Sequence, residues 1–203
     1  IGLTVEAGTP RGFYLAGWPG TAWPNTFPSV QFWDEANGTL IAPSSNEDLL
    51  AEYGGCWIAL GASNSPTMLT IGGLTGHKLG TDQKTFTVTR SGPDANQKGW
   101  NLVYNPYQAR LDWNEVIDPA YGNDAVVEDQ YSVYDTQLRR HRRYGTNFAG
   151  VDWADASEQS VDLSDSLRYI NPGQSFWVRV ADGVSSGTFT LKPEMISNYG
   201  DGL

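Results

Sequence analysis

One strand pattern occurs twice in this chain, and the segments that follow it repeat in the same order. Residues 12–19 read GFYLAGWP and residues 99–106 read GWNLVYNP, both of the form Gly-aromatic-x-Leu-small-x-x-Pro. Three pairs of segments follow: VQFWDEANGTL with YSVYDTQLRRHRRY, YGGCWIALGA with NPGQSFWVRVADG, and PTMLTI with SGTFTL. Self-similarity that keeps its order indicates duplicated structural units. The sequence therefore predicts two related β units, residues 1–90 and 91–203, packed together as one compact module.

The repeated segments alternate in the manner of β-strands, and glycine and proline punctuate them. The 23 glycines and 11 prolines among 203 residues favour short strands joined by turns. In NPGQSFWVRVADG, Phe176, Val178 and Val180 share one face, which we expect to be a core face. Trp177 and its counterpart Trp57 point the other way, and we expect loops of the opposite unit to cover them. The predicted fold class is all-β, with two antiparallel units in a sandwich-like arrangement.

One or two short helical turns interrupt this pattern. DWNEVIDP predicts a turn with Asp112 as its N-cap, Glu115 three residues on and Pro119 at its end. SSNEDLLAEYGG allows another turn, with Ser45 and Asp48 spaced as a capping box. Both turns are too short to alter the all-β class.

The segment GWNLVYNPYQARLDW, residues 99–113, resembles the signature G-W-N-L-[IV]-x-N-P-[YF]-x-x-x-[IL]-D-W of β-rich surface regions in Bacteroidetes proteins exported by type IX secretion. YSVYDTQLRRHRRYG and INPGQSFWVRV also resemble segments of that family. The chain departs from the signature at Tyr104, where Gly is usual, and at Gln108, where Pro is usual. The resemblance implies an extracellular or cell-surface β module, and it supplies no catalytic residue.

The charge balance excludes several classes of partner. The formal net charge is −10 and the isoelectric point is about 4.5. Binding to nucleic acid needs clustered cations that neutralise phosphates, so we expect no nucleic-acid partner. No segment has the roughly 18 to 20 apolar residues of a membrane-spanning helix, so we expect no membrane span.

Cys56 is the only cysteine, so the chain has no internal disulfide, and we expect Cys56 to act as a small buried hydrophobe.

Candidate catalytic groups are few. The chain has two histidines: His77 in a glycine-rich turn, and His141 among arginines whose charge disfavours its protonation. No nucleophile-elbow, zinc-protease or phosphate-loop motif occurs. An Asp/Glu pair of the glycosidase type remains an alternative, because carboxylates are plentiful between Asp112 and Asp165. We expect a protein that is not an enzyme.

Oxygen-rich loops provide candidate ligands for a structural metal ion. DPAYGND contains Asp118 and Asp124, and VEDQYSVYD contains Asp129. Carboxylate and carbonyl oxygens are ligands of Ca²⁺, although the spacing is not that of an EF-hand loop. The expected cofactor is none, or a structural calcium ion at these residues.

Two segments carry tryptophans outside the repeated strands. Trp18 and Trp23 lie in GWPGTAWPNTFP, which is too rich in Pro and Gly for a paired strand and is predicted to be a loop. Trp153 lies in NFAGVDWADA, where Asp152 and Asp155 can accept hydrogen bonds from hydroxyl groups. Aromatic rings on rigid loops stack on sugar faces, so these five residues form a hypothetical polysaccharide site. The alternative is that the tryptophans plug the ends of the sandwich.

The segment RRHRR contains four of the thirteen Lys and Arg residues. As a strand it has cations on both faces, which predicts an exposed edge or hairpin protected against aggregation. The alternative is a docking surface for acidic loops of another copy or for an anionic polysaccharide. These hypothetical contact residues are Arg139, Arg140, Arg142 and Arg143. The sequence thus favours a secreted carbohydrate-binding module, with a structural, adhesive or filament-forming surface protein as the alternative.

Overall fold

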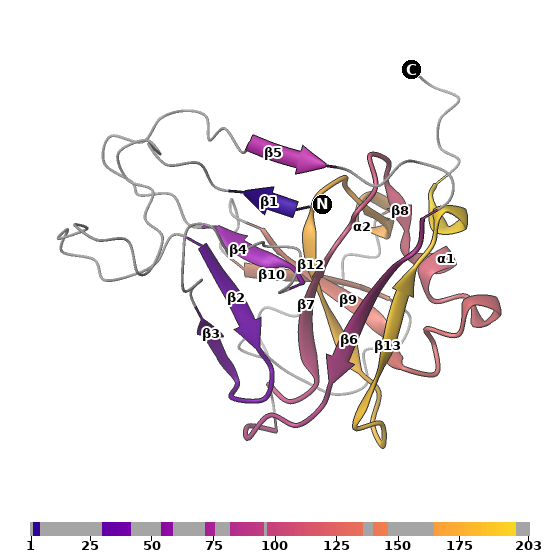
Figure 1. Ribbon diagram of the computed structural model, residues 1–203. Coiled ribbons are helices and arrows are strands. Elements are labelled where there is room, and N and C mark those ends of the chain that lie inside the picture. The colour runs from indigo at the N-terminus through magenta and orange to yellow at the C-terminus, as the bar shows by residue number, and fades with distance from the viewer. Residues whose placement is uncertain are drawn as a thin grey trace, which may run out of the picture.

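The computed structural model of the chain describes residues 2–4, 30–41, 54–58, 72–75, 82–95, 97–135, 140–145 and 165–197 (Figure 1). All of its paired strands are antiparallel, and its helices have only three or four residues each, which confirms the predicted all-β class. The described helices are α1 (Trp113–Val116), η2 (Pro119–Tyr121), α2 (Asp165–Arg168) and η4 (Pro193–Met195). None of these described helices has the length and apolar character needed to cross a membrane.

A four-stranded sheet forms the middle layer, with the strand order β10-β9-β12-β7. Its core face carries Phe176, Val178 and Val180, all fully buried as predicted from their alternation. Tyr131 and Val133 lie on the same face, on the neighbouring strand. The strands are β7 (Trp100–Tyr104), β9 (Val127–Asp135), β10 (Arg140–Gly145) and β12 (Ser175–Val180).

A two-stranded sheet of β6 (Lys84–Thr89) and β13 (Ser186–Leu191) covers this core face. Phe86, Val88 and Phe189 alternate inward along these strands and join the main hydrophobic cluster. Tyr104, where the resembled signature has Gly, ends β7 with its ring 5.3 Å from that of Phe86. β6 precedes the predicted division at residue 90 but pairs with β13, so one sheet contains strands from both predicted units.

A three-stranded sheet with the order β3-β2-β4 lies against the opposite face of the middle layer. It consists of β2 (Val30–Asp34), β3 (Thr39–Ile41) and β4 (Cys56–Ile58). The ring of Trp33 meets that of Trp177 edge-on at 5.2 Å, and Trp57 lies 4.7 Å from Tyr134. Trp177 is 4% exposed, and Trp33, a strand residue of the opposite unit, is among the side chains that cover it.

The sheet β3-β2-β4 and the strands β10-β9-β12 pair in the same order and the same register. The equivalent cross-strand pairs are Gln31 with Trp57 and Ser132 with Trp177, and Asp34 with Thr39 and Asp135 with Arg140. Exchanging the two units therefore maps the Trp33–Trp177 contact onto the Tyr134–Trp57 contact. The aromatic faces of the two repeats pack together about an approximate two-fold relation.

Close approach between the repeats requires glycine at the start of β4. The Gly55 N–H donates to the Leu102 carbonyl at 2.9 Å. A Cβ at Gly55 would lie 2.5 Å from the carbonyl oxygen of Val103, which no side chain can occupy. The GG of YGGCW is therefore explained by its contact with β7.

The two buried asparagines of GWNLVYNP form hydrogen bonds with backbone groups. Asn101 accepts from the Thr89 N–H at 3.1 Å and donates to the Thr89 carbonyl at 2.9 Å. Asn105 accepts from the Tyr107 N–H at 2.9 Å and donates to carbonyl groups of three residues, Ala109, Ile170 and Asn171. Buried side-chain amides that form hydrogen bonds with backbone groups in this way stabilise segments whose backbone is not paired with a neighbouring strand. The motif is therefore explained by the fold.

Asp112 caps α1 as predicted, accepting from the Asn114 N–H at 3.1 Å. Its two oxygens also accept from Arg168 at 2.8 and 2.6 Å, which raises the pKa of the Arg168 guanidinium through hydrogen bonding. This pair joins α2 to the short strand β8 (Leu111–Asp112), which also pairs with the strand β11 (Tyr169–Ile170). The remaining described strands, β1 (Gly2–Thr4) and β5 (Gly72–Thr75), pair with each other. PTMLTI and most of SSNEDLLAEYGG lie outside the described residues.

Candidate functional site

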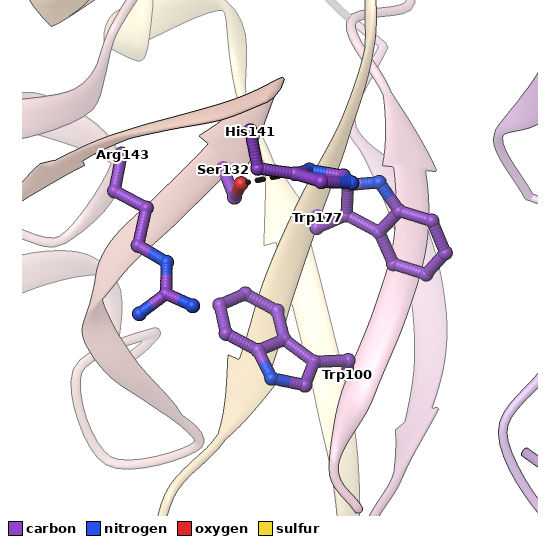
Figure 2. A pocket seen from close by; sticks show the side chains of 5 residues that line it. All are labelled: Trp100, Ser132, His141, Arg143 and Trp177. Carbon is purple, nitrogen blue, oxygen red and sulfur yellow. Dashed lines mark hydrogen bonds between the residues drawn. The ribbon is translucent and has the colours of Figure 1, made fainter. Parts of the chain in front are cut away.

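The face of the middle sheet opposite its main core is lined by aromatic and cationic side chains. Register places Arg143, Ser132 and Trp177 side by side on β10, β9 and β12. Leu102 is the next residue of this row on β7, and Trp100 lies two residues before it on the same face (Figure 2). The guanidinium carbons of Arg143 and Arg179 lie 5.4 and 6.0 Å from the centre of the Trp100 ring. A cation held at this distance is attracted by the negative face of the indole.

His141 lies on this face among rings. Its centroid is 5.3 Å from Tyr134, 6.3 Å from Trp177 and 6.4 Å from Trp57. Its Nδ1 lies 3.2 Å from Ser132 Oγ, and the dashed line in Figure 2 marks this contact. Burial, followed by the nearby Arg143 charge, lowers the pKa of His141 to about 4. The predicted effect of neighbouring cations is thus present, but burial is the larger cause.

The Ser132–His141 contact has the residue types of a nucleophile and base, yet its surroundings do not suit catalysis. Ser132 is 3% exposed, and the space among Ser132, His141, Arg143 and the two tryptophans does not admit even a water molecule. A base with a pKa of about 4 has little driving force to take a proton at neutral pH. The contact therefore orients His141 between the aromatic rings.

The low pKa of His141 predicts how stability depends on pH. Between pH 6.5 and 4 the unfolded chain protonates this imidazole while the folded chain does not, so stability should fall as pH decreases through this window. We expect NMR titration of the His141 ring to give a midpoint near pH 4. His141→Asn should flatten the pH dependence of unfolding in the same window. A midpoint near 6.5 would contradict the burial of the ring.

The rim of this face is partly open to solvent. Tyr134 is 36% exposed, and among the large hydrophobic side chains in the described part of the chain, only Ile41 at 37% is comparable. Trp57 and His141 contact the Tyr134 ring and are themselves half-buried. We call Trp57, Tyr134 and His141 the aromatic rim.

The predicted basic segment is an edge strand, because β10 pairs only with β9 within the described sheet. Arg142 and Arg143 project from opposite faces, as expected for a strand, and both are half-buried. Arg142 pairs with Asp135 at 3.6 Å, and Arg143 lies over Trp100. Arg140 begins the strand, and Arg139 lies outside the described residues. Their role in contacts with a partner stays a prediction.

The predicted sugar-binding residues Trp18, Trp23, Asp152, Trp153 and Asp155 all lie outside the described residues. The site that the structure does describe was missed by sequence reasoning, although one signal existed. Tyr134 occupies the position in the second repeat that Trp33 occupies in the first. An aromatic residue at both equivalent positions indicated a shared aromatic face.

The three candidate calcium ligands have separate surroundings. Asp118 caps η2 by accepting from the Ala120 N–H at 2.8 Å, and Asp129 accepts from Trp113 Nε1 at 3.1 Å. Asp124 is exposed. Across the ranges that the structure describes, no three His, Cys, Asp or Glu side chains gather as a metal site would require. The contacts of Asp118 and Asp129 are explained without a metal ion.

Glu35 is a buried carboxylate that sequence reasoning missed. It is 5% exposed and accepts from the N–H groups of Ser91, Gly92 and Gly99 and from the Thr89 hydroxyl, at 2.8 to 2.9 Å. Burial alone would raise its pKa, but these hydrogen bonds outweigh burial and lower it to about 2. The β2–β3 turn is thereby fixed to the β6–β7 connection.

Cys56 is half-buried at the start of β4, and burial raises the pKa of its thiol to about 11. A protonated thiol is a poor nucleophile and metal ligand. This environment favours the predicted packing role.

A groove of about 540 Å³ lies between the β2–β3 hairpin and strands β6 and β7. Its lining includes Trp33, Asp34, Ile41, Lys84, Thr85 and Thr87. This volume is within the range of small-ligand sites. No protein family, curated protein or solved structure matches this chain.

Proposed function

We propose that this protein is a non-catalytic, extracellular carbohydrate-binding module, and that the aromatic rim forms part of its contact surface. The observation that carries this proposal is the Tyr134 ring, which is exposed yet held between Trp57 and His141. C–H groups of a sugar ring pack favourably on the negative face of an aromatic ring. The phenolic hydroxyl can both donate and accept a hydrogen bond, which suits sugar hydroxyls.

Rigidity of the rim favours binding. Trp57 lies on β4 of the first repeat, whereas Tyr134 and His141 lie on β9 and β10 of the second. Packing between the repeats therefore immobilises the exposed ring before any ligand arrives. A preorganised side chain loses little rotamer entropy on binding, which is otherwise a cost of about 0.5–1.5 kcal/mol per side chain.

The extracellular location in this proposal is supported by the likeness of residues 99–113 to surface regions of exported Bacteroidetes proteins. The described side chains of RRHRR give the alternative, a self-assembling surface protein, less support. Arg142 and Arg143 already contact Asp135 and Trp100 within the chain. A polysaccharide is therefore the partner that we propose first.

The test is tryptophan fluorescence during titration with soluble plant and algal polysaccharides. Trp57 lies 4.7 Å from Tyr134, so a sugar on the rim should change its emission. We expect Tyr134→Ala to weaken binding about tenfold, which corresponds to roughly 1.4 kcal/mol. Ile41→Ala is the matched control, because it removes a side chain of equal exposure outside the rim, and its effect should stay within about twofold.

Two outcomes separate the rim from the predicted loops. If Trp18→Ala with Trp23→Ala abolishes binding while Tyr134→Ala leaves it unchanged, the module binds sugar through its loop and the rim is structural. If no polysaccharide produces a saturable change in the wild-type protein, carbohydrate binding is wrong and self-assembly becomes the leading function.

A further inference from the structure

The edge of β6 that faces β7 is an incompletely paired strand edge. Arg90 N–H donates to the Ser185 carbonyl at 2.8 Å, so alternate residues 84, 86 and 88 form hydrogen bonds with β13. The backbone groups of Thr85, Thr87 and Thr89 must then point away from β13. Thr190, which lies opposite Thr85, agrees with this alternation. The Thr190 N–H donates to the Asn123 side chain, and the Thr190 carbonyl accepts from it, on the side of β13 that faces away from β6.

One of these three outward positions is already occupied by an amide. The Asn101 side chain accepts from the Thr89 N–H and donates to the Thr89 carbonyl. A neighbouring strand would make this same pair of hydrogen bonds with its backbone. Thr85 and Thr87 N–H and carbonyl groups have no hydrogen-bond partner among the described residues, and both residues line the groove. The unpaired edge of β6 therefore includes two further positions, Thr85 and Thr87, beyond the one that the amide of Asn101 occupies.

The groove beside this edge has opposite charges at its two ends. Lys84 stands at the start of β6, with its ammonium 5.3 and 5.7 Å from the ring centres of Phe86 and Tyr104. Lys84 forms no ion pair with a described residue. Asp34 lines the other end, beside the Glu35 turn that holds Thr89 and Ser91. A ligand that follows the edge meets a cation at one end and a carboxylate at the other.

We propose that this groove binds an extended peptide, which adds as a strand to the β6 edge. Thr85 and Thr87 present donor and acceptor groups at the two-residue period that a peptide backbone matches and a sugar does not. Charge complementarity requires an acidic residue near Lys84 and a basic residue near Asp34. The distance from Lys84 to Thr89 is roughly 16 Å for five residues of strand, so about five residues of peptide fill the groove.

The direction of the peptide follows from the same geometry. Every described strand pair is antiparallel, and we assign the bound peptide the same orientation relative to β6. Its basic end is then N-terminal, near Asp34, and its acidic end is C-terminal, near Lys84. Alternate apolar side chains of the peptide face Phe86, Leu102 and Val103, which also line the groove.

The probe that tests this is the peptide acetyl-Lys-Val-Thr-Val-Asp-amide, titrated into the full chain and followed by NMR. We expect saturable binding and slower hydrogen exchange at the amides of Thr85 and Thr87. A peptide N-methylated at the amides that face β6 should not bind. The peptide with exchanged ends, acetyl-Asp-Val-Thr-Val-Lys-amide, should bind about five- to tenfold more weakly, because it places like charges together.

Two protein variants complete the test. Thr87→Pro removes an N–H that points into the groove and leaves the hydrogen bonds to β13 intact, so binding should be lost while the thermal midpoint changes little. Lys84→Glu should weaken binding of the first peptide by the same five- to tenfold, and changing the peptide's Asp to Lys should restore it. This charge exchange keeps the proposal testable even if the proline variant fails to fold.

Three results would overturn the proposal: no binding at millimolar peptide, equal binding of the N-methylated peptide, or protection confined to other strands. Saccharide-induced protection of Thr85 and Thr87 without any peptide binding would reassign the groove to sugar. Tyr134→Ala should leave peptide affinity unchanged, so failure of the carbohydrate proposal and failure of this one are distinguishable.

Discussion

Replacing Glu35 with glutamine is expected to lower the thermal unfolding midpoint by roughly 6–12 °C, which corresponds to about 3 kcal/mol in a domain of this size. The carboxylate accepts hydrogen bonds from three backbone N–H groups and two hydroxyls around Thr89, Ser91 and Gly99. A neutral amide has one oxygen and a donor where a second acceptor is needed, so buried N–H groups lose their partners. Thermal denaturation followed by circular dichroism measures the loss.

The same carboxylate sets a second pH window. Its pKa is about 2 in the folded chain and about 4.5 in the unfolded chain, so the unfolded state binds more protons between these values. Stability from Glu35 is therefore complete above about pH 5 and is lost as pH falls toward 2. Glu35→Gln should remove this dependence, which extends to lower pH than the window of His141.

Asp34→Asn is the matched control for Glu35. Asp34 is the neighbouring acid, and its hydrogen bonds go to Asn37 within the same exposed turn. Its substitution should change stability by less than about 0.5 kcal/mol. A loss below about 1 kcal/mol in Glu35→Gln would show that the turn is not fixed through this carboxylate.

Trp177→Ala is expected to cost about 3–5 kcal/mol, the range for removing a large buried aromatic side chain. Trp177 is 4% exposed and packs with Trp100 and Leu102 on its own sheet and with Trp33 of the other repeat. Its removal leaves a cavity at the centre of the interface between the two aromatic faces. Urea unfolding measures the loss, and near-ultraviolet circular dichroism should lose the signal of the edge-on Trp33–Trp177 pair.

The internal repeat provides the control for this prediction. Trp57 is the equivalent residue in the first unit, but it is half-buried and packs against Tyr134 at the rim. Trp57→Ala should therefore cost clearly less than Trp177→Ala. A double-mutant cycle between Trp33 and Trp177 should give a coupling of about 0.5–1.5 kcal/mol. Equal losses at the two tryptophans would contradict the asymmetric burial of the interface.

Much of the local structure could be predicted because it depends on short-range periodicity. The alternation of Phe176, Val178 and Val180 identified the core face of β12, and the residues around Asp112 identified the cap of α1. The repeat placed Trp57 and Trp177 at equivalent positions, and the structure gives them equivalent partners on β2 and β9. Each of these inferences needs only neighbouring residues or a comparison between two segments of the chain.

The candidate sites could not be predicted in this way, because each joins side chains whose partners are distant in sequence. Glu35 binds groups more than fifty residues away, and the amide of Asn101 closes part of an edge that belongs to β6. The sequence placed Arg143 on an edge strand but did not indicate that it lies over Trp100.

The sequence by itself determined the all-β class, the alternation of core residues and the helical turn capped by Asp112. Tertiary structure alone decided which aromatic residues are exposed, where the groove lies and which backbone groups of β6 remain available. The physical reason is that strand formation follows a local pattern of side chains. A site, in contrast, depends on which polar and aromatic groups are left at the surface after the sheets have packed.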